Sequence, residues 1–458
     1  MKRFALVALL AAMLFGVATS ASATELKVKG NLDVYGMWSA NLMDHNSDYG
    51  DADNYFTTQR MRTYFTYVAN ENLKAVLGLE MDQIWGQSSG GDWGTDGKGN
   101  IEIKHAYMDF NFPDTKVNVK AGLQYVALPS VFGNPIFDDD AAALVVSAPI
   151  NEMFGVTVGY TRGADNKANV NDEPFDDYDT SDDMDMAFIA LPVTLDGFEV
   201  TPYFGYAWIG EDVDFTDGKG NTIQQGISTT NPTGYGWDEL INSTGDDATV
   251  MVIGANAALT MFDPLTFAAD LIYAKADNDE FETSGWYAAL AASYKFDMLT
   301  ATLFGTYGTG LNDDNDFEDQ DIMPTLAEGW GLTPYIGGVR AFSTTYDSFA
   351  TDNLGIGSDG TGLWTVGLVL DKISFVENLS HKFVAAYARG TSDEDTGLLF
   401  TEEDSGYEFY LVNKYMIYEN LAAINELGYF KGDSEAAEDD DYDLDASYFA
   451  TIGFQYKF

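Results

Sequence analysis

Apolar and polar residues alternate along much of this chain with a period of two. From Leu444 to Phe458 the even-numbered residues are apolar, while most odd-numbered residues are polar or small. Because successive side chains of a strand point to opposite faces, this pattern predicts strands with one apolar and one polar face. The same alternation recurs at 116–125, 198–208, 285–296 and 299–307.

The connections between the predicted strands alternate between short and long. This asymmetry is typical of outer-membrane barrels, whereas a soluble β-sandwich, the alternative for alternating strands, has no reason to keep it. The pattern therefore predicts an all-β fold, a transmembrane antiparallel β-barrel of about 18 strands, with 16 as the nearest alternative. The short turns fall at 70–72, 112–115, 149–153, 195–197, 262–264, 297–298, 377–378 and 419–420; the long segments are 41–58, 86–100, 163–183, 210–247, 310–361, 390–405 and 432–442.

Aromatic residues gather near the predicted strand ends. Interfacial anchoring places such rings at headgroup level, whereas a soluble core would scatter them along strand centres. We therefore expect two aromatic girdles. The long-loop girdle contains Trp38, Trp85, Trp208, Trp286 and Trp364, and the short-turn girdle contains Phe112, Phe154, Phe198, Phe262, Phe296, Tyr418 and Phe458.

The first residues have the features of a secretory signal peptide. Lys2 and Arg3 precede an apolar stretch that ends at a small-residue cleavage signal, 21–23. This stretch is shorter than the roughly 20 residues that a membrane-spanning helix needs. We expect residues 1–23 to be removed, leaving one barrel domain, 24–458, exported to the outer membrane of a Gram-negative cell. The last strand should pair with the first, 26–40, since lipid tolerates no open sheet edge.

Charge and composition exclude several partners. The chain carries 23 Lys and Arg against 73 Asp and Glu, a net charge of −50, so nucleic acid is not the expected partner. The acidic loops lack the spacing of an EF-hand, and we expect diffuse divalent cation binding that bridges to lipopolysaccharide rather than a specific metal site. With no Cys and three dispersed histidines (His45, His105 and His381), we expect no catalytic site and no cofactor.

The C-terminus carries a second signal. Phe454, Tyr456 and Phe458 alternate up to the free end of the chain, and this ending resembles the signal that hands outer-membrane barrels to their assembly machinery. The alternative is an ordinary edge strand that happens to end in Phe.

The segment 125–140 departs from the strand pattern. It contains Phe132 between two prolines and ends in Asp138, Asp139 and Asp140. By position it looks like the loop between strands five and six that folds into the lumen of trimeric general porins, so these four residues are the candidate pore constriction. The candidate basic counterpart on the pore wall is Arg60, Arg62, Lys74 and Lys120.

Opposed carboxylates and cations would create a transverse field across a narrow waist. The alternative is that the aspartates are solvated loop residues and that the basic residues form ordinary ion pairs along the wall.

Several motifs together resemble the outer membrane homotrimeric porins of Desulfovibrio-like sulfate-reducing bacteria. These are 59–62 followed by the turn at 70–73, the strand 106–110, the loop 132–135 leading to the three aspartates, and the terminal Phe. The resemblance implies a homotrimer of water-filled channels for passive diffusion of small hydrophilic solutes and ions.

Two alternatives stay open. One is a substrate-specific channel for small anions such as sulfate or organic acids, with a saturable site at Arg60 and Arg62. The other is a structural or adhesive surface protein that conducts nothing. The net negative charge favours a mild cation preference that weakens as salt screens the loops.

Overall fold

The structure is a computed structural model that describes residues 25–42, 53–86, 100–165, 183–210, 213, 247–278, 282–312, 319–327, 329–342, 362–394, 400–433 and 445–458. The proposed signal peptide, 1–23, and His45 lie outside these residues. No helix among the described residues is long and apolar enough to cross a membrane.

The strands are β1 (Glu25–Ala40), β2 (Asp53–Asn70), β3 (Leu73–Ile84), β4 (Asn100–Asn111), β5 (Asn118–Ala127), β6 (Asp138–Pro149), β7 (Gly155–Asp165), β8 (Asp183–Ala190), β9 (Val193–Leu195), β10 (Phe198–Ile209), β11 (Ala248–Phe262), β12 (Leu265–Asp277), β13 (Glu282–Lys295), β14 (Thr300–Gly308), β15 (Asp319–Asp321), β16 (Leu363–Val376), β17 (Leu379–Gly390), β18 (Ser405–Tyr418), β19 (Leu421–Asp433) and β20 (Ser447–Lys457).

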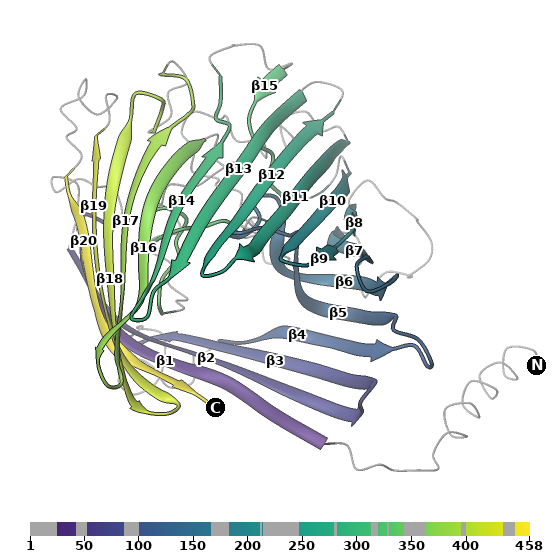
Figure 1. Cartoon of the computed structure of the whole chain (residues 1–458), viewed down its shortest axis with the longest axis horizontal. Coiled ribbons are helices and arrows are strands. Elements are labelled where there is room, and N and C mark those ends of the chain that lie inside the picture. Colours follow the sequence, from purple (N-terminus) through teal and green to yellow (C-terminus); the bar gives the residue numbers. More distant parts are fainter. Residues whose placement is uncertain are drawn as a thin grey trace, which may run out of the picture.

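These strands form one closed antiparallel barrel (Figure 1). β1 pairs with β2 on one side and with β20 on the other, from Asn31↔Lys457 to Ala40↔Tyr448, which removes both free edges of the sheet. β8 and β9 are two parts of one strand, interrupted at Leu191 and Pro192, and β15 is a short strand in the β14–β16 connection. The barrel therefore has 18 strands, which confirms the predicted fold and the preferred strand count.

The short turns lie where the alternation placed them. At the turn between β16 and β17, Asn378 has a φ of +64°, a left-handed conformation that Asn tolerates better than most residues. At the rim with the longer connections, the connection between β12 and β13 is brief. The alternation pattern alone did not mark it as a separate loop.

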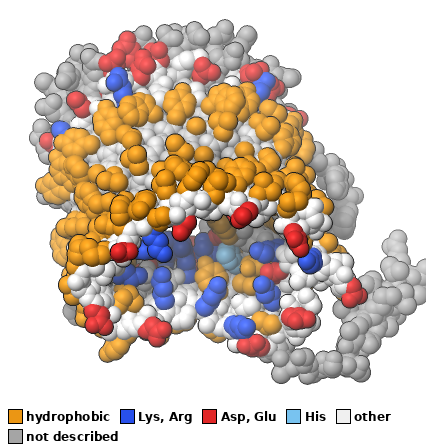
Figure 2. Space-filling model, viewed as in Figure 1, with side chains coloured by type: hydrophobic (Ala, Val, Ile, Leu, Met, Phe, Trp, Pro, Cys, Tyr) orange, Lys and Arg blue, Asp and Glu red, His pale blue; other side chains and the backbone are white. Residues whose placement is uncertain are grey.

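The two faces of the barrel differ as the alternation predicts. On β20, Ile452 and Phe454 are more than half exposed on the outside, whereas Phe449 and Thr451 are buried inside. Apolar side chains cover much of the outer surface (Figure 2). Side chains from both predicted girdles are about half exposed or more, among them Trp38, Trp85, Trp208 and Trp286 at one rim and Phe112, Phe262, Phe296 and Tyr418 at the other.

The interior is less polar than a simple water-filled barrel would need. Met37, Ile272 and Tyr287 are completely buried although their strands place them on the inner face. They pack in two apolar clusters that include residues of the β5–β6 and β14–β16 connections, such as Ile136 and Phe342. Two connections therefore enter the barrel and bury apolar wall residues there.

Candidate functional site

The β5–β6 connection crosses the barrel interior. The Val131 amide donates to Asp270 Oδ2 on β12 at 2.7 Å, and Ser130 Oγ donates to the same oxygen at 3.0 Å. Asn134 Nδ2 donates to the Tyr203 hydroxyl of β10 at 3.0 Å. The Phe132 ring contacts the Phe304 ring of β14, with centroids 5.6 Å apart. Since β14 lies nearly opposite β5 in the ring of strands, the connection spans the lumen.

Residues 322–327 and 329–342 of the β14–β16 connection also lie inside the barrel. Trp330 Nε1 donates to the Tyr287 hydroxyl of β13 at 3.0 Å. The Thr333 hydroxyl donates to the Glu408 carboxylate of β18, which also accepts from the Tyr335 amide. The described part of the long 310–361 segment, whose position no pattern in the sequence predicts, thus follows the inner wall.

Arg340 fixes the far end of this segment. Its Nη2 lies 3.0 Å from Glu426 Oε2 of β19, and both side chains are almost fully buried. The guanidinium also lies over the Tyr35 and Phe449 rings, 5.5 and 5.1 Å from their centroids. Burial opposes the charged form of Arg340, but Glu426, Tyr35 and Tyr410 outweigh it, and the pKa of Arg340 is raised.

Tyr335 is the other titratable anchor of the segment. Its ring stacks on Phe430 of β19 at a centroid distance of 5.2 Å. Burial and then the nearby Glu408 raise the pKa of the Tyr335 hydroxyl, so it stays protonated at neutral pH.

The two inserted segments are bonded to each other. The Leu326 and Ala327 amides donate to the Ile136 carbonyl at 2.9 and 3.0 Å, and the Asp138 amide donates back to the Ala327 carbonyl at 2.7 Å. Farther along, the Gly329 and Gly331 amides donate to the carbonyls of Asn134 and Phe132, each at 3.0 Å. The segments therefore form one narrowing body inside the barrel, which we call the inner plug: residues 128–137, 322–327 and 329–342.

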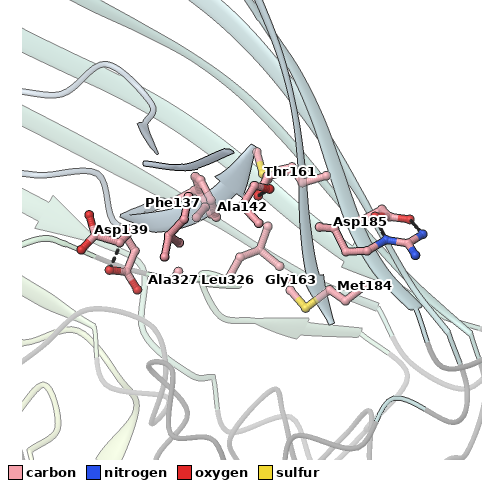
Figure 3. Close-up of a pocket in the computed structure, with 14 residues that line it drawn as sticks. Phe137, Asp139, Ala142, Thr161, Gly163, Met184, Asp185, Leu326 and Ala327 are labelled. Carbon is pink, nitrogen blue, oxygen red and sulfur yellow. Dashed lines mark hydrogen bonds and ion pairs between the residues drawn. The ribbon is translucent and has the colours of Figure 1, made fainter. Parts of the chain in front are cut away.

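A pocket of about 220 Å³ lies between the inner plug and the β5–β8 wall (Figure 3). Phe137, Leu326 and Ala327 of the plug line one part of it, and Met184 lines another. Asp139 stands at one end, and the bidentate Arg162–Asp185 pair, with N–O distances of 2.9 Å, stands at the other.

The candidate basic residues occupy one sector of the inner wall. Arg60 Nε donates to Asp82 Oδ1 at 2.7 Å, and Arg60 Nη2 lies 3.3 Å from Glu80 Oε1. Arg62 also pairs with Glu80. Lys74 Nζ lies 3.0 Å from Asp109 Oδ2. Lys120 is the register partner of that aspartate on β5. Figure 2 shows Lys and Arg side chains gathered on the wall of a hollow in the molecule.

The acidic triplet occupies the first three positions of β6 rather than the loop itself. Asp138 accepts from the Tyr125 hydroxyl at 2.5 Å, and Asp139 accepts from the Asp140 amide at 2.6 Å. Asp140 pairs with Lys104 and lies 2.9 Å from His105 Nε2. The ladder between β4 and β5 ends at Ala106↔Leu123, and beyond that point Asp140 connects β6 to β4.

The triplet and the four candidate cations share the wall from β2 to β6. The aspartates and the cations each contact side chains of nearby strands on this wall, so they do not form two rows that face each other across the lumen. Among the four residues proposed for the constriction, Phe132 alone reaches across the lumen, through its contact with Phe304.

The proposed assembly residues lie at the closing seam. The Phe458 amide donates to the Gly30 carbonyl at 3.0 Å, and the Gly30 amide donates to the Phe458 carbonyl at 2.8 Å. Phe454 is exposed on the outer face, and the Tyr456 ring stacks with the Phe458 ring at 5.7 Å. The terminal residue therefore completes the pairing between β20 and β1.

Sequence reasoning missed the acidic residues that hold the inner plug: Asp270, Glu408 and Glu426. One signal was available. Each carboxylate stands on the inner face of a strand, and Arg340 is the one basic residue of segment 310–361. A lone cation in a long acidic segment requires a partner when it is buried.

The geometry defines a class: a closed barrel with an apolar exterior, a charged inner wall and a narrowing inserted body. No protein-family model matches the chain, and no curated protein matches its sequence. Its fold is similar to that of OpdQ from Pseudomonas aeruginosa, with a TM-score of 0.53 and 9% identity over 95% of this chain and 99% of that one.

Two further solved structures share the fold. OccAB3 from Acinetobacter baumannii has a TM-score of 0.52 and 11% identity, covering 94% of this chain and 99% of its own. The outer membrane protein OprD from Pseudomonas aeruginosa has a TM-score of 0.50 and 12% identity, covering 94% of each chain. At these identities the likeness establishes a common barrel architecture.

Proposed function

We propose that this protein is an outer-membrane porin, a water-filled channel for passive diffusion of small hydrophilic solutes and ions. The observation that carries the proposal is the combination of an apolar outer face with a charged inner wall that surrounds an inserted plug. An apolar outer face is stable against lipid hydrocarbon, and a charged inner face is stable against water. OprD, whose fold is similar, is an outer membrane protein, and this supports the same location for the present chain.

Planar-bilayer recording of the purified full-length mature protein tests this function. We expect discrete conductance steps that scale linearly with salt concentration. A protein that inserts into the bilayer, shows the heat-dependent gel migration of a folded barrel and gives no steps would instead be a structural or adhesive surface protein.

A channel selective for small anions is the second candidate. Lys414 and Lys457 line a pocket of about 520 Å³ together with Glu419, Asn420 and Gln455, beside Phe458. The two ammonium groups would attract sulfate or a carboxylate, and the Glu419 carboxylate would oppose that attraction. Arg60 and Arg62 are weaker candidates for such a site because Glu80 and Asp82 already neutralise them. Conductance that saturates with sulfate but not with chloride would establish this alternative.

The remaining assignments complete the proposal. We infer cleavage after Ala23, delivery to the barrel assembly machinery through Phe454, Tyr456 and Phe458, and assembly as a homotrimer. We also infer diffuse divalent cation bridges from the acidic loops to lipopolysaccharide. We propose no catalytic role and no cofactor, and we retain the resemblance to the porins of Desulfovibrio-like bacteria as a proposal.

A further inference from the structure

A chain of hydrogen bonds crosses four strands near the short-turn rim. His381 Nδ1 of β17 donates to Asn413 Oδ1 of β18 at 2.6 Å. Asn413 Nδ2 donates to Asn425 Oδ1 of β19 at 3.0 Å, and Asn425 Nδ2 donates to the Thr451 carbonyl of β20 at 2.7 Å. The first two contacts join register partners, His381↔Asn413 and Asn413↔Asn425. We call these three side chains the polar row.

The polar row stands on the outer face of the barrel. Along β18, Asn413 alternates with the buried Tyr410 and Val412 and shares its face with the exposed Phe409 and Tyr415. Along β19, Asn425 shares its face with the exposed Leu427, while the neighbouring Glu426 is buried inside. The row therefore points away from the lumen.

Apolar residues flank each member of the row on its own strand. On its face of β18, Asn413 lies between Leu411 and Tyr415. Tyr415 and Tyr418, the last residue of the strand, lie nearer the short-turn rim than Asn413 does. His381 lies between Leu379 and Phe383, and Asn425 lies between Ala423 and Leu427. In a membrane, the row thus lies on the hydrocarbon side of the aromatic girdle.

The internal hydrogen bonds leave part of the row's capacity unused. An amide has two N–H donors, and Asn413 and Asn425 each use one. The His381 ring donates through Nδ1, so the Nε2 of a neutral imidazole is an acceptor. Polar groups without partners are costly in hydrocarbon, and polar residues at membrane depth commonly mark contacts between proteins.

We propose that the polar row is a contact surface between copies of this chain within the membrane. This inference rests on the proposed membrane location and assigns the face for the proposed oligomer. Every copy inserts with the same orientation, so rotation about an axis normal to the membrane keeps the row at one depth. Amides are both donors and acceptors, so a second copy offers matching groups at that depth, which lipid tails do not.

Another part of the outer face, on β12 to β14, provides control positions for the polar row. Leu271, Leu290 and Leu303 are each more than half exposed on the outer face of β12, β13 and β14, and β16 separates these strands from those of the row. This apolar face fits lipid, and it provides matched control positions.

Single-cysteine photocrosslinking tests the surface without background, because the chain contains no Cys. Asn413→Cys and, as the control, Leu303→Cys would be labelled with a benzophenone maleimide in isolated outer membranes and irradiated. We expect heat-resistant adducts at two or three times the chain mass from Asn413→Cys, at least fivefold more than from the control. Equal yields, adducts to another protein, or lipid adducts alone would overturn the proposal.

A second variant gives an independent readout. Asn413→Leu combined with Asn425→Leu suits a lipid-facing surface, so the barrel should fold, whereas the oligomer should dissociate at a lower temperature on gels run without boiling. Unchanged dissociation would contradict the proposed contact. Bilayer recording of the same preparations separates the two proposals: conductance without crosslinks rejects the contact surface alone, and crosslinks without conductance reject the channel alone.

Discussion

Asp140 of β6 and His105 of β4 are joined through Oδ1 and Nε2 at 2.9 Å, although their strands are not neighbours in the sheet. Lys104 pairs with the same carboxylate. Backbone pairing between β4 and β5 ends at Ala106↔Leu123 and does not include His105, so these side chains connect β6 to β4 beyond the end of that ladder. One carboxylate thus connects β6 to both Lys104 and His105 of β4.

Replacing Asp140 by Ala should therefore loosen the wall and leave Lys104 without its counter-charge. We expect a loss of about 1–3 kcal/mol in the free energy of unfolding, because polar groups lose their partner. We also expect the reversal potential under a salt gradient to shift toward anion preference. Asp114→Asn removes the same charge from an exposed turn and should change neither quantity; an equal shift in both variants would exclude a specific role for Asp140.

Removing one partner of the Arg340–Glu426 pair should release part of the inner plug. Glu426→Gln leaves a buried guanidinium without its counter-ion, and breaking a buried pair commonly costs about 3–5 kcal/mol. We expect higher single-channel conductance and faster protease cleavage within 319–342. The double variant Arg340→Met, Glu426→Met removes both charges and should stay closer to the unmodified protein; identical behaviour of single and double variants would contradict this.

The β5–β6 side of the plug depends on Asp270. Asp270 accepts from Ser130, Val131 and Asn256. Asp270→Ala should detach this loop and raise conductance, whereas Asp270→Asn keeps one side-chain acceptor oxygen and should produce a smaller increase. Bilayer recordings of the two variants in the same salt show which variant conducts more. A larger increase in conductance from Asp270→Asn than from Asp270→Ala would disprove the assigned contact.

Deleting Phe458 should slow assembly of the barrel, since its backbone closes the β20–β1 seam at Gly30. We expect at least a severalfold lower yield of the folded, heat-modifiable band in outer membranes. Phe375→Ala serves as the control because Phe375 is a more exposed aromatic of β16 and makes no closing pair. A normal yield after deletion of Phe458 would remove it from the assembly proposal.

Local periodicity was sufficient to predict the barrel. On β18 the alternation of Tyr407 and Phe409 with Glu408 and Tyr410 specifies two faces, and the turns follow from where that alternation stops. The strand count followed from the same pattern. Pro192 divides one strand into β8 and β9, because proline has no N–H to donate to the neighbouring strand.

Long-range partners were not encoded in any local pattern. Arg60 and Arg62 were expected to oppose the aspartates, yet the register between β2 and β3 places Glu80 and Asp82 directly beside them. Asp138 to Asp140 resemble a loop in the sequence because acidic runs usually are loops, but pairing with β5 makes them a strand. Insertion of 322–327 and 329–342 depends on their contacts with β13, β18 and β19, which no single segment reveals.

The hydrogen bonds between Ile136 and Ala327, and between Phe132 and Gly331, have a mechanical consequence. Either half of the inner plug can swing out only if these backbone bonds break or if the other half moves with it. Displacement should thus be concerted, and a current trace of one channel should jump between two levels without a long-lived intermediate substate.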